Sequence, residues 1–229
     1  MNPLILQQAR LPISVDLASI QREVDDLTGW QAHFNTRQYS GSWSALSLRA
    51  PGGQSHHIIP DALNDLPYAD TELMERSASI QQLLHNFSCD LLSVRLLNLA
   101  AGARIAEHRD HGLAFEQGEA RLHIPIRTNT GVGFYVNGAA VPMPEGSCWY
   151  INANLPHRVA NEGASDRIHL VIDCVVNDWL RSLFAGGEQV FCAPAPDTGT
   201  RAVIDELRRQ STPFALRLAD DMERQLRNP

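Results

Sequence analysis

The middle of the chain alternates between apolar and polar residues. From Leu91 onward, short alternating segments are separated by turn signals such as Ala101-Gly102 and Asn137-Gly138. A period of two is typical of strands that bury one face, and the segment 43–49 shows the same pattern. The remaining predicted strands are 92–99, 121–127, 133–136, 148–152, 157–161 and 167–176. Many short strands at such spacing predict a sandwich or barrel of the jelly-roll type.

A helical period replaces the alternation in the segment 70–87. Apolar residues recur there every three or four positions, and Asp70 or Thr71 can cap the first turn. The apolar stripe consists of Leu73, Ile80, Leu83 and Leu84. We therefore expect a helix that packs one face against the core. After Trp179 the pattern becomes helical again.

These elements predict an α+β protein that is mainly β. Residues 1–180 are expected to form the jelly-roll domain, with strand and helical elaboration at its N-terminal end, and residues 181–229 a short helical extension. Within the extension, a loop rich in Pro, Gly and Ala and two helices are predicted at 186–199, 201–210 and 214–227. The two helices are interpreted as a cap on the core or as the contact of a homodimer.

The composition narrows the classes of function. The chain has 229 residues, of which 44% are hydrophobic and 20% charged, so it can bury a sizeable core. Its formal net charge of -7 argues against nucleic acid as a partner. No apolar stretch approaches the roughly 20 residues that span a bilayer, and the N-terminus lacks the basic region of a secretory signal. Four cysteines without a CxxC spacing favour reduced thiols, so we expect a cytoplasmic protein without membrane association.

A candidate metal site lies around the triplet His108-Arg109-Asp110. In an extended chain, residues two positions apart point to the same side, so His108 and Asp110 can reach one metal ion. His157, which follows Pro156 at the start of a later predicted strand, can supply a third ligand. Two histidines and one carboxylate leave about three coordination positions open, which suits the iron(II) of non-haem oxygenases. Zinc with the same ligands is the alternative, in a cupin-like hydrolase or isomerase.

Two of the predicted strands carry a basic face opposite an apolar one. Arg121, His123 and Arg127 share one face of the first strand, and Arg167 and His169 share one face of the second. The guanidinium group can bind a carboxylate through two parallel hydrogen bonds, which an ammonium group cannot do. If the outer side of the barrel is covered, these basic faces line a cavity suited to a small acid. The alternative is an exposed sheet face.

The order of these motifs resembles the aspartyl/asparaginyl β-hydroxylase family of 2-oxoglutarate-dependent oxygenases. The matching elements are Leu97-x-Leu99-x-x-Gly102-x-x-Ile105, His108-x-Asp110, Arg121-x-His123, Pro156-His157 and the run from Arg167 to Asp173. The resemblance covers about 80 residues, roughly a third of the chain. It implies a cupin-like, double-stranded β-helix core with flanking helices.

The resemblance also implies an activity and a set of site residues. Fe(II) is then held by His108, Asp110 and His157. The co-substrate 2-oxoglutarate is then contacted by Arg121, His123 and Arg167. With O2, such an enzyme hydroxylates a C–H bond and releases succinate and CO2. Because Asp110 is present where some members have glycine, the chain is similar to the bacterial branch that includes the proline cis-4-hydroxylases.

The substrate that this branch implies is small and polar, either a free amino acid or a residue within a peptide or a carrier-bound intermediate. Arg95 or Arg127 is a candidate for holding the carboxylate of a free amino acid, and Glu116 for holding its ammonium group. An apolar lining is expected from Leu97, Ile105, Phe134 and Tyr135. A barrel that binds a small acid without catalysis is the alternative outside enzymology.

Overall fold

The computed structural model describes residues 4–58, 66–110 and 112–193, and isolated helical residues between 204 and 224. The chain divides into two compact units, one of residues 4–192 and one of residues 1–3 with 193–229. The helices predicted at 201–210 and 214–227 lie largely outside the described residues. No helix among the described residues is both long and apolar enough to cross a lipid bilayer.

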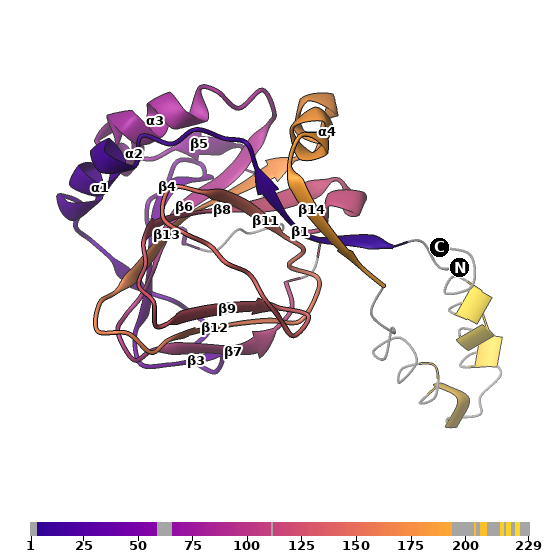
Figure 1. Ribbon diagram of the computed structural model, residues 1–229. Helices are drawn as coiled ribbons and strands as arrows, with labels where there is room; N and C mark the ends of the chain where they lie inside the picture. Colours follow the sequence, from indigo (N-terminus) through magenta and orange to yellow (C-terminus); the bar gives the residue numbers. More distant parts are fainter. Residues whose placement is uncertain are drawn as a thin grey trace. The chain divides into compact units, whose positions relative to one another are not determined.

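The first unit, residues 4–192, contains two antiparallel sheets that face each other (Figure 1). The larger sheet consists of β1 (Ile5–Leu11), β2 (Gln31–Ala32), β4 (Trp43–Pro51), β5 (Tyr68–Asp70), β6 (Leu91–Leu99), β8 (Glu119–Arg127), β11 (Cys148–Ile151), β13 (Arg167–Val175) and β14 (Glu188–Cys192). Its strand order is β14-β1-β11-β8-β13-β6-β4-β2, and β5 pairs with β4.

The smaller sheet closes the other side of the barrel. It consists of β3 (Tyr39–Ser40), β7 (Arg104–His108), β9 (Val132–Val136), β10 (Ala139–Ala140) and β12 (His157–Asn161), in the order β10-β9-β12-β7-β3. From β6 to β9 the chain alternates between the two sheets, since β6 and β8 lie in the larger sheet and β7 and β9 in the smaller one. This architecture confirms the predicted double-stranded β-helix, a jelly roll with flanking helices.

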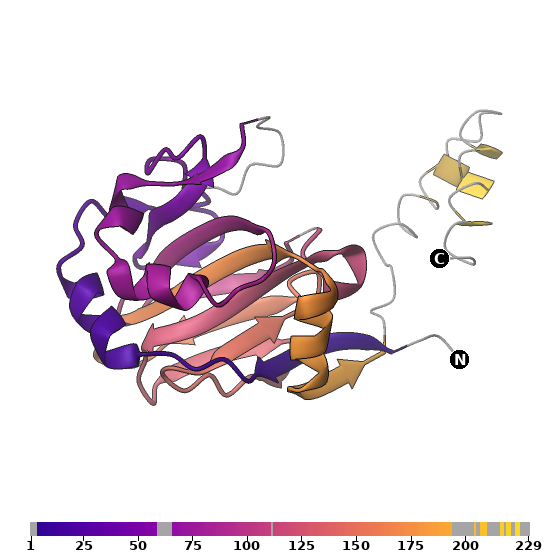
Figure 2. The same cartoon turned by 90° about the horizontal axis from the view of Figure 1, so that it is seen from above.

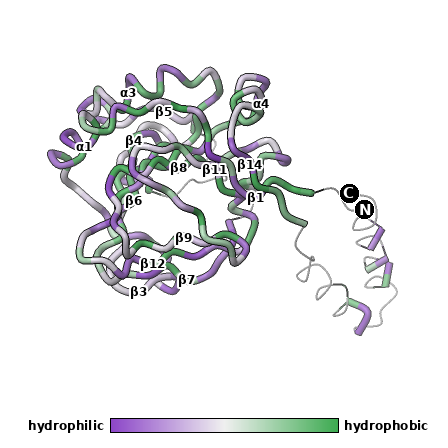
Figure 3. The backbone as a smooth tube through the Cα atoms, in the orientation of Figure 1, coloured by the Kyte–Doolittle hydropathy of each residue, from purple (hydrophilic) through white to green (hydrophobic). Residues whose placement is uncertain are grey.

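The helices cover the outer face of the larger sheet (Figures 1 and 2). They are α1 (Leu17–Asp25), α2 (Glu72–Glu75), α3 (Ala78–Leu84) and α4 (Asp178–Ala185), and a 3-10 turn, η1 (Phe115–Gln117), precedes β8. Their apolar faces pack on alternate residues of the strands, so that Ile124 and Leu170 join Ile20, Ile80 and Phe184 in one core. Figure 3 shows hydrophobic and hydrophilic residues alternating along the strands. The helices therefore exclude water from the outer face of the larger sheet, and the polar residues of its strands face the barrel interior.

The helix predicted at 70–87 is present as two shorter helices. Thr71 caps α2, because its side chain accepts a hydrogen bond from the backbone N–H of Leu73. The chain leaves the helix at Arg76 and Ser77, where the buried Ser77 hydroxyl donates to the carbonyl of Leu73. A serine that bonds back to the preceding turn competes with the regular helix. The predicted apolar stripe is confirmed, since Leu73, Ile80, Leu83 and Leu84 are all buried.

The loop predicted at 186–199 is wrong in its first half. Residues 188–192 form β14, which pairs with β1 at the edge of the larger sheet. Four of its five residues are exposed, so the segment has no buried face that alternation could reveal. Its strand conformation comes instead from backbone pairing with β1, a non-local contact. The larger sheet thus continues past residue 180.

The turn between β3 and β4 fits closely against the start of β7. Gly41 has a φ of 81°, and a Cβ atom placed on it would lie 2.8 Å from the Cβ and 2.9 Å from the Cα of Ala103. Gly102 has a similar φ of 76°, but a Cβ atom there would meet nothing within 4 Å. The two glycines share a left-handed backbone and differ in the space around them.

This difference predicts unequal costs of adding a methyl group. Gly102→Ala should lower the free energy of unfolding by about 1–2 kcal/mol, the cost of a left-handed conformation at a residue with a Cβ. Gly41→Ala should cost about 1–3 kcal/mol more, because the backbone of Ala103 must move. Chemical denaturation of both variants measures the difference. Equal losses in the free energy of unfolding would show that the β3–β4 turn is not tightly packed against the start of β7.

Candidate functional site

A cavity of about 610 Å³ lies between the two sheets. Its lining combines apolar and aromatic side chains, such as Leu97, Ile105 and Phe134, with the charged residues of β6, β8 and β13. A cavity of this size is typical of sites for small molecules. All six residues predicted to bind the metal or the co-substrate line it: His108, Asp110, Arg121, His123, His157 and Arg167.

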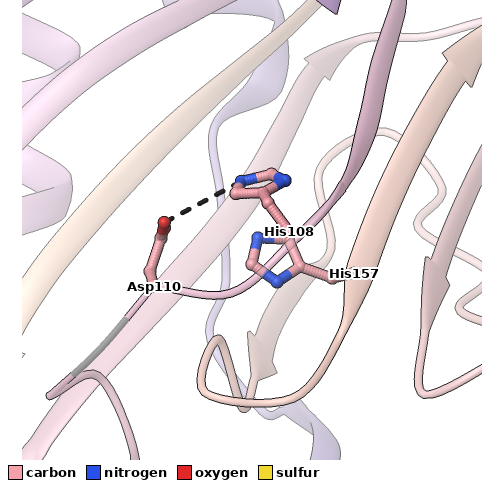
Figure 4. Close-up of side chains that lie close together, drawn as sticks. All are labelled: His108, Asp110 and His157. Carbon is pink, nitrogen blue, oxygen red and sulfur yellow. Dashed lines mark ion pairs between the residues drawn. The ribbon is translucent and has the colours of Figure 1, made fainter. Parts of the chain in front are cut away.

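Three of these residues form a cluster with the spacing of a metal site. His108 ends β7, His157 begins β12, and the two are directly opposite each other in the antiparallel pair of these strands. Asp110 follows β7 by two residues, and its backbone N–H donates to the carbonyl of Ala153. One potential ligand atom from each side chain lies within 4.8 Å of the others. Figure 4 shows the three side chains turned toward one another.

Both histidines present the same ring nitrogen to this cluster. The Nδ1 atom of His108 lies 2.9 Å from the carbonyl of Ala106, and that of His157 lies 3.0 Å from the carbonyl of Leu155. Because a carbonyl oxygen can only accept, Nδ1 carries a proton in both rings, and Nε2 is the nitrogen left to face the cluster. Burial lowers the pKa of His157 to about 4, so its ring is neutral near pH 7. A neutral imidazole with a free Nε2 is the form that binds a metal.

Asp110 divides its two carboxylate oxygens between neighbours. Oδ1 lies 3.8 Å from Nε2 of His108, and Oδ2 accepts a hydrogen bond from Nη1 of Arg121. Burial acts to raise the pKa of Asp110, but Arg121 and the nearby histidines lower it overall. The group is therefore a carboxylate at neutral pH. Two imidazole nitrogens and one carboxylate oxygen on one side of a cavity fit Fe(II), which keeps its other positions for small ligands.

Arg167 carries a buried positive charge without a carboxylate to balance it. The residue is 2% exposed, and the hydrogen bond it makes is to Nδ1 of His169, at 2.7 Å. No ion pair joins it to any acidic residue in the part of the chain that the structure describes, and its buried Nε has no hydrogen-bond partner there. Burial lowers the pKa of Arg167 to about 9, so it is still charged at neutral pH. An isolated buried cation is costly unless a bound anion neutralises it.

His123 stands beside this cation with both ring nitrogens buried and unpartnered among the described residues. Its ring packs edge-on against Phe134 and His169. Burial, reinforced by the charge of Arg167, lowers the pKa of His123 well below its usual value. A neutral imidazole with two free nitrogens can both donate to and accept from a polar ligand.

The structure corrects two of the residues predicted to hold a substrate. Arg127 does not face the cavity, because its guanidinium pairs with the carboxylate of Asp25 on α1. The β8–β13 register shifts between Pro125 and Arg127, which reverses the alternation at the end of the strand. Glu116 accepts from the backbone N–H of Leu6 and is outside the lining, whereas Glu119 is part of it.

The expected apolar lining is correct for Leu97, Ile105 and Phe134 and wrong for Tyr135. The ring of Tyr135 lies outside the lining, with the guanidinium of Arg158 stacked over it at 3.9 Å. Alternation along β9 accounts for this, since Phe134 and Tyr135 are neighbours and point to opposite faces. The pattern itself could have excluded Tyr135.

Asp173 is a cavity residue to which the sequence analysis assigned no role. It shares the face of Arg167 and His169 on β13, at the same period of two, so the pattern contained the signal. Its carboxylate bonds to Arg121 and Arg95. Trp43 and His33 also line the cavity, and their ring centroids stack 3.5 Å apart. No sequence pattern predicts this contact between the two residues.

Comparisons with known proteins agree with this arrangement. The family described as Aspartyl/Asparaginyl beta-hydroxylase matches residues 9–176. L-proline cis-4-hydroxylase from Rhizobium meliloti (strain 1021) is 28% identical over 151 residues, which cover 65% of this chain and 53% of that protein. The chain thus spans about half the length of this curated relative.

A solved structure shares the fold. An oxidoreductase of the 2OG-Fe(II) oxygenase family from Burkholderia pseudomallei has a TM-score of 0.50 at 14% identity, covering 70% of this chain and 78% of that one. The family match spans most of the β-barrel and includes all six predicted site residues. The chain therefore belongs to the aspartyl/asparaginyl β-hydroxylase family.

Proposed function

We propose that this protein is an Fe(II)- and 2-oxoglutarate-dependent dioxygenase. It hydroxylates a C–H bond of an amino acid or amino-acid residue and releases succinate and CO2. The observation that carries the proposal is the pairing of two features in one cavity: a cluster of His108, Asp110 and His157, and the uncompensated buried cation of Arg167. The first is a donor set for iron(II), and the second needs an anionic ligand.

His108, Asp110 and His157 are the proposed ligands of Fe(II). When bound, the iron supplies the redox chemistry with O2 and the co-substrate. The chain supplies Nε2 of both histidines, whose Nδ1 atoms are held by backbone carbonyls, and a carboxylate on Asp110. The apolar walls around Ile105 and Phe134 exclude bulk water from the reacting atoms.

Arg167 is the proposed anchor of the distal carboxylate of 2-oxoglutarate. Its guanidinium gains the counter-charge that the protein does not provide, in a site where water does not compete. His123 is proposed to contact the near end of the co-substrate through its two free nitrogens. Arg121, which also lines the cavity, is proposed to contact the co-substrate between its two ends. A zinc hydrolase or isomerase would use the same metal ligands, but it would not explain the uncompensated charge of Arg167.

We further propose that the substrate is a free amino acid. Among the described residues, the buried arginines of the cavity are Arg95, Arg121 and Arg167, and the carboxylates that contact them are Asp110 and Asp173. Fe(II) and the 2-oxoglutarate dianion cancel in charge, so these five side chains leave one positive charge in excess, beside the separate carboxylate of Glu119 in the same lining. This excess supports an anionic group on the substrate, and we propose Arg95, which lines the cavity, as the residue that holds it.

Glu119 supports the other end of an amino acid. It lies in the cavity lining at the start of β8 and is half-buried. Burial and the neighbouring Asp173 raise its pKa. A carboxylate disfavoured in this way is stabilised by an ammonium group beside it. The similarity to L-proline cis-4-hydroxylase supports the same class of substrate.

Arg167→Met should separate co-substrate binding from stability. Losing a charge-assisted pair in a confined site should raise the KM for 2-oxoglutarate by roughly 10²-fold or more. The apoprotein should be no less stable, because methionine fills similar space and removes an uncompensated charge. Arg167→Lys should recover only part of the affinity, since an ammonium group cannot form the fork. Succinate formation against 2-oxoglutarate concentration and chemical denaturation provide the two measurements.

Arg127→Met is the matched control for this prediction. Arg127 lies opposite Ile168, the neighbour of Arg167, but its charge pairs with Asp25 outside the cavity. Its substitution should leave the KM for 2-oxoglutarate unchanged. If Arg167→Met also left that KM unchanged, the assignment of Arg167 would be wrong.

A panel of the twenty free amino acids tests the substrate class. With Fe(II) and 2-oxoglutarate present, at least one should stimulate succinate formation above the uncoupled background and gain 16 mass units, that is, about one oxygen atom. Glu119→Gln should raise the KM for that amino acid more than the KM for 2-oxoglutarate, because the lost charge faces the ammonium group. Stimulation by peptides or carrier-bound residues alone would contradict the free amino acid and leave the dioxygenase intact.

A further inference from the structure

Asp173 is bonded from three sides inside the barrel. It is 2% exposed and lies directly opposite Arg121 in the pairing of β13 with β8. Arg121 donates to both of its oxygens, from Nε at 2.6 Å and from Nη2 at 2.9 Å. Arg95 Nη2 and Ser93 Oγ donate to the same carboxylate at 3.1 Å and 2.8 Å. A two-point contact of this kind fixes the plane of a guanidinium group.

The free end of the same guanidinium reaches the candidate metal ligand. Nη1 of Arg121 donates to Oδ2 of Asp110, which leaves Oδ1 on the side of His108. Asp110 lies beyond the end of β7, and a third of its side chain is exposed. The sheet therefore does not set the orientation of this carboxylate in the way that it sets the two histidines. Arg121 is the side chain that does so.

We propose that Asp173 is a positioning residue for the metal centre: it locks Arg121, and Arg121 turns a single oxygen of Asp110 toward the two histidines. This inference rests on the proposed function, because it assigns Asp110 to the metal. Partners that orient the ligands of a metal commonly change its affinity by 10- to 100-fold when they are removed. A single facing oxygen also leaves the remaining metal positions to the co-substrate and to O2.

The neighbouring Arg95 provides a matched comparison. Arg95 and Arg121 are both buried and both donate to Asp173, so replacing either one by lysine disturbs the same carboxylate. Of these two arginines, only Arg121 also forms an ion pair with Asp110 within the described part of the chain. A general loss of packing would affect both variants alike, whereas loss of positioning would affect Arg121→Lys alone.

The test is an anaerobic calorimetric titration of the apoprotein with Fe(II), without 2-oxoglutarate. Arg121→Lys and Asp173→Asn should each weaken Fe(II) binding by about 10- to 100-fold. Arg95→Lys should stay within about threefold of the wild type. The double variant Arg121→Lys/Asp173→Asn should lose little more than either single variant, because the two residues act in one chain of contacts. If Asp173→Asn does not fold, Arg121→Lys and Arg95→Lys decide the question.

The titration separates this inference from the proposed function. Wild-type Fe(II) affinity in Arg121→Lys would overturn the positioning role while leaving the three ligands in place. Equal weakening in Arg121→Lys and Arg95→Lys would overturn it too, by showing a structural effect. A wild-type protein that binds no Fe(II), or a His157→Ala variant that binds it as tightly as the wild type, would instead contradict the metal centre itself.

Discussion

Burying a guanidinium group costs several kcal/mol unless carboxylates and hydrogen bonds compensate for its lost hydration. The β-barrel of this protein buries three arginines in one cavity, as judged from the described residues, and compensates them unevenly. Asp173 bonds to Arg95 and Arg121 in a network that includes Ser93, and Asp110 bonds to Arg121 as well. Arg167 has no such partner within the described part of the chain. The described residues thus leave one buried positive charge uncompensated, at Arg167, and we propose that the co-substrate dianion compensates it.

Sheet geometry brings the candidate site residues together in this cavity. The antiparallel pair of β7 and β12 places His108 opposite His157, and the pair of β8 and β13 places Arg121 opposite Asp173. Directly opposed residues in a sheet are close neighbours with side chains on the same face. Two cross-strand pairs from opposite sheets therefore meet across the barrel. The helices on the outside make this possible, because they bury the apolar residues that alternate with the polar ones.

Much of the fold and of the candidate site could be predicted from the sequence, because a period of two indicates both where a strand lies and which of its residues share a face. It identified the strands that hold the site, and it placed Arg121, His123 and Arg167 on the face that lines the cavity. The same rule failed at Arg127, where a shift in the β8–β13 register turns the side chain outward. It also could not reveal β14, whose exposed residues are ordered by pairing with β1. The contact of Arg121 with Asp110 and Asp173 joins three separate segments, and no local pattern encodes it.

The proposed coupling is that one metal site and one anion site act together in the cavity. Its most direct test is an anaerobic titration of the protein with Fe(II) and then with 2-oxoglutarate, in the wild type and in His157→Ala. We expect one Fe(II) per chain in the wild type, tighter binding of 2-oxoglutarate once the metal is present, and loss of both in His157→Ala. Binding of 2-oxoglutarate that is equally tight with and without metal, or that survives His157→Ala unchanged, would contradict this coupling.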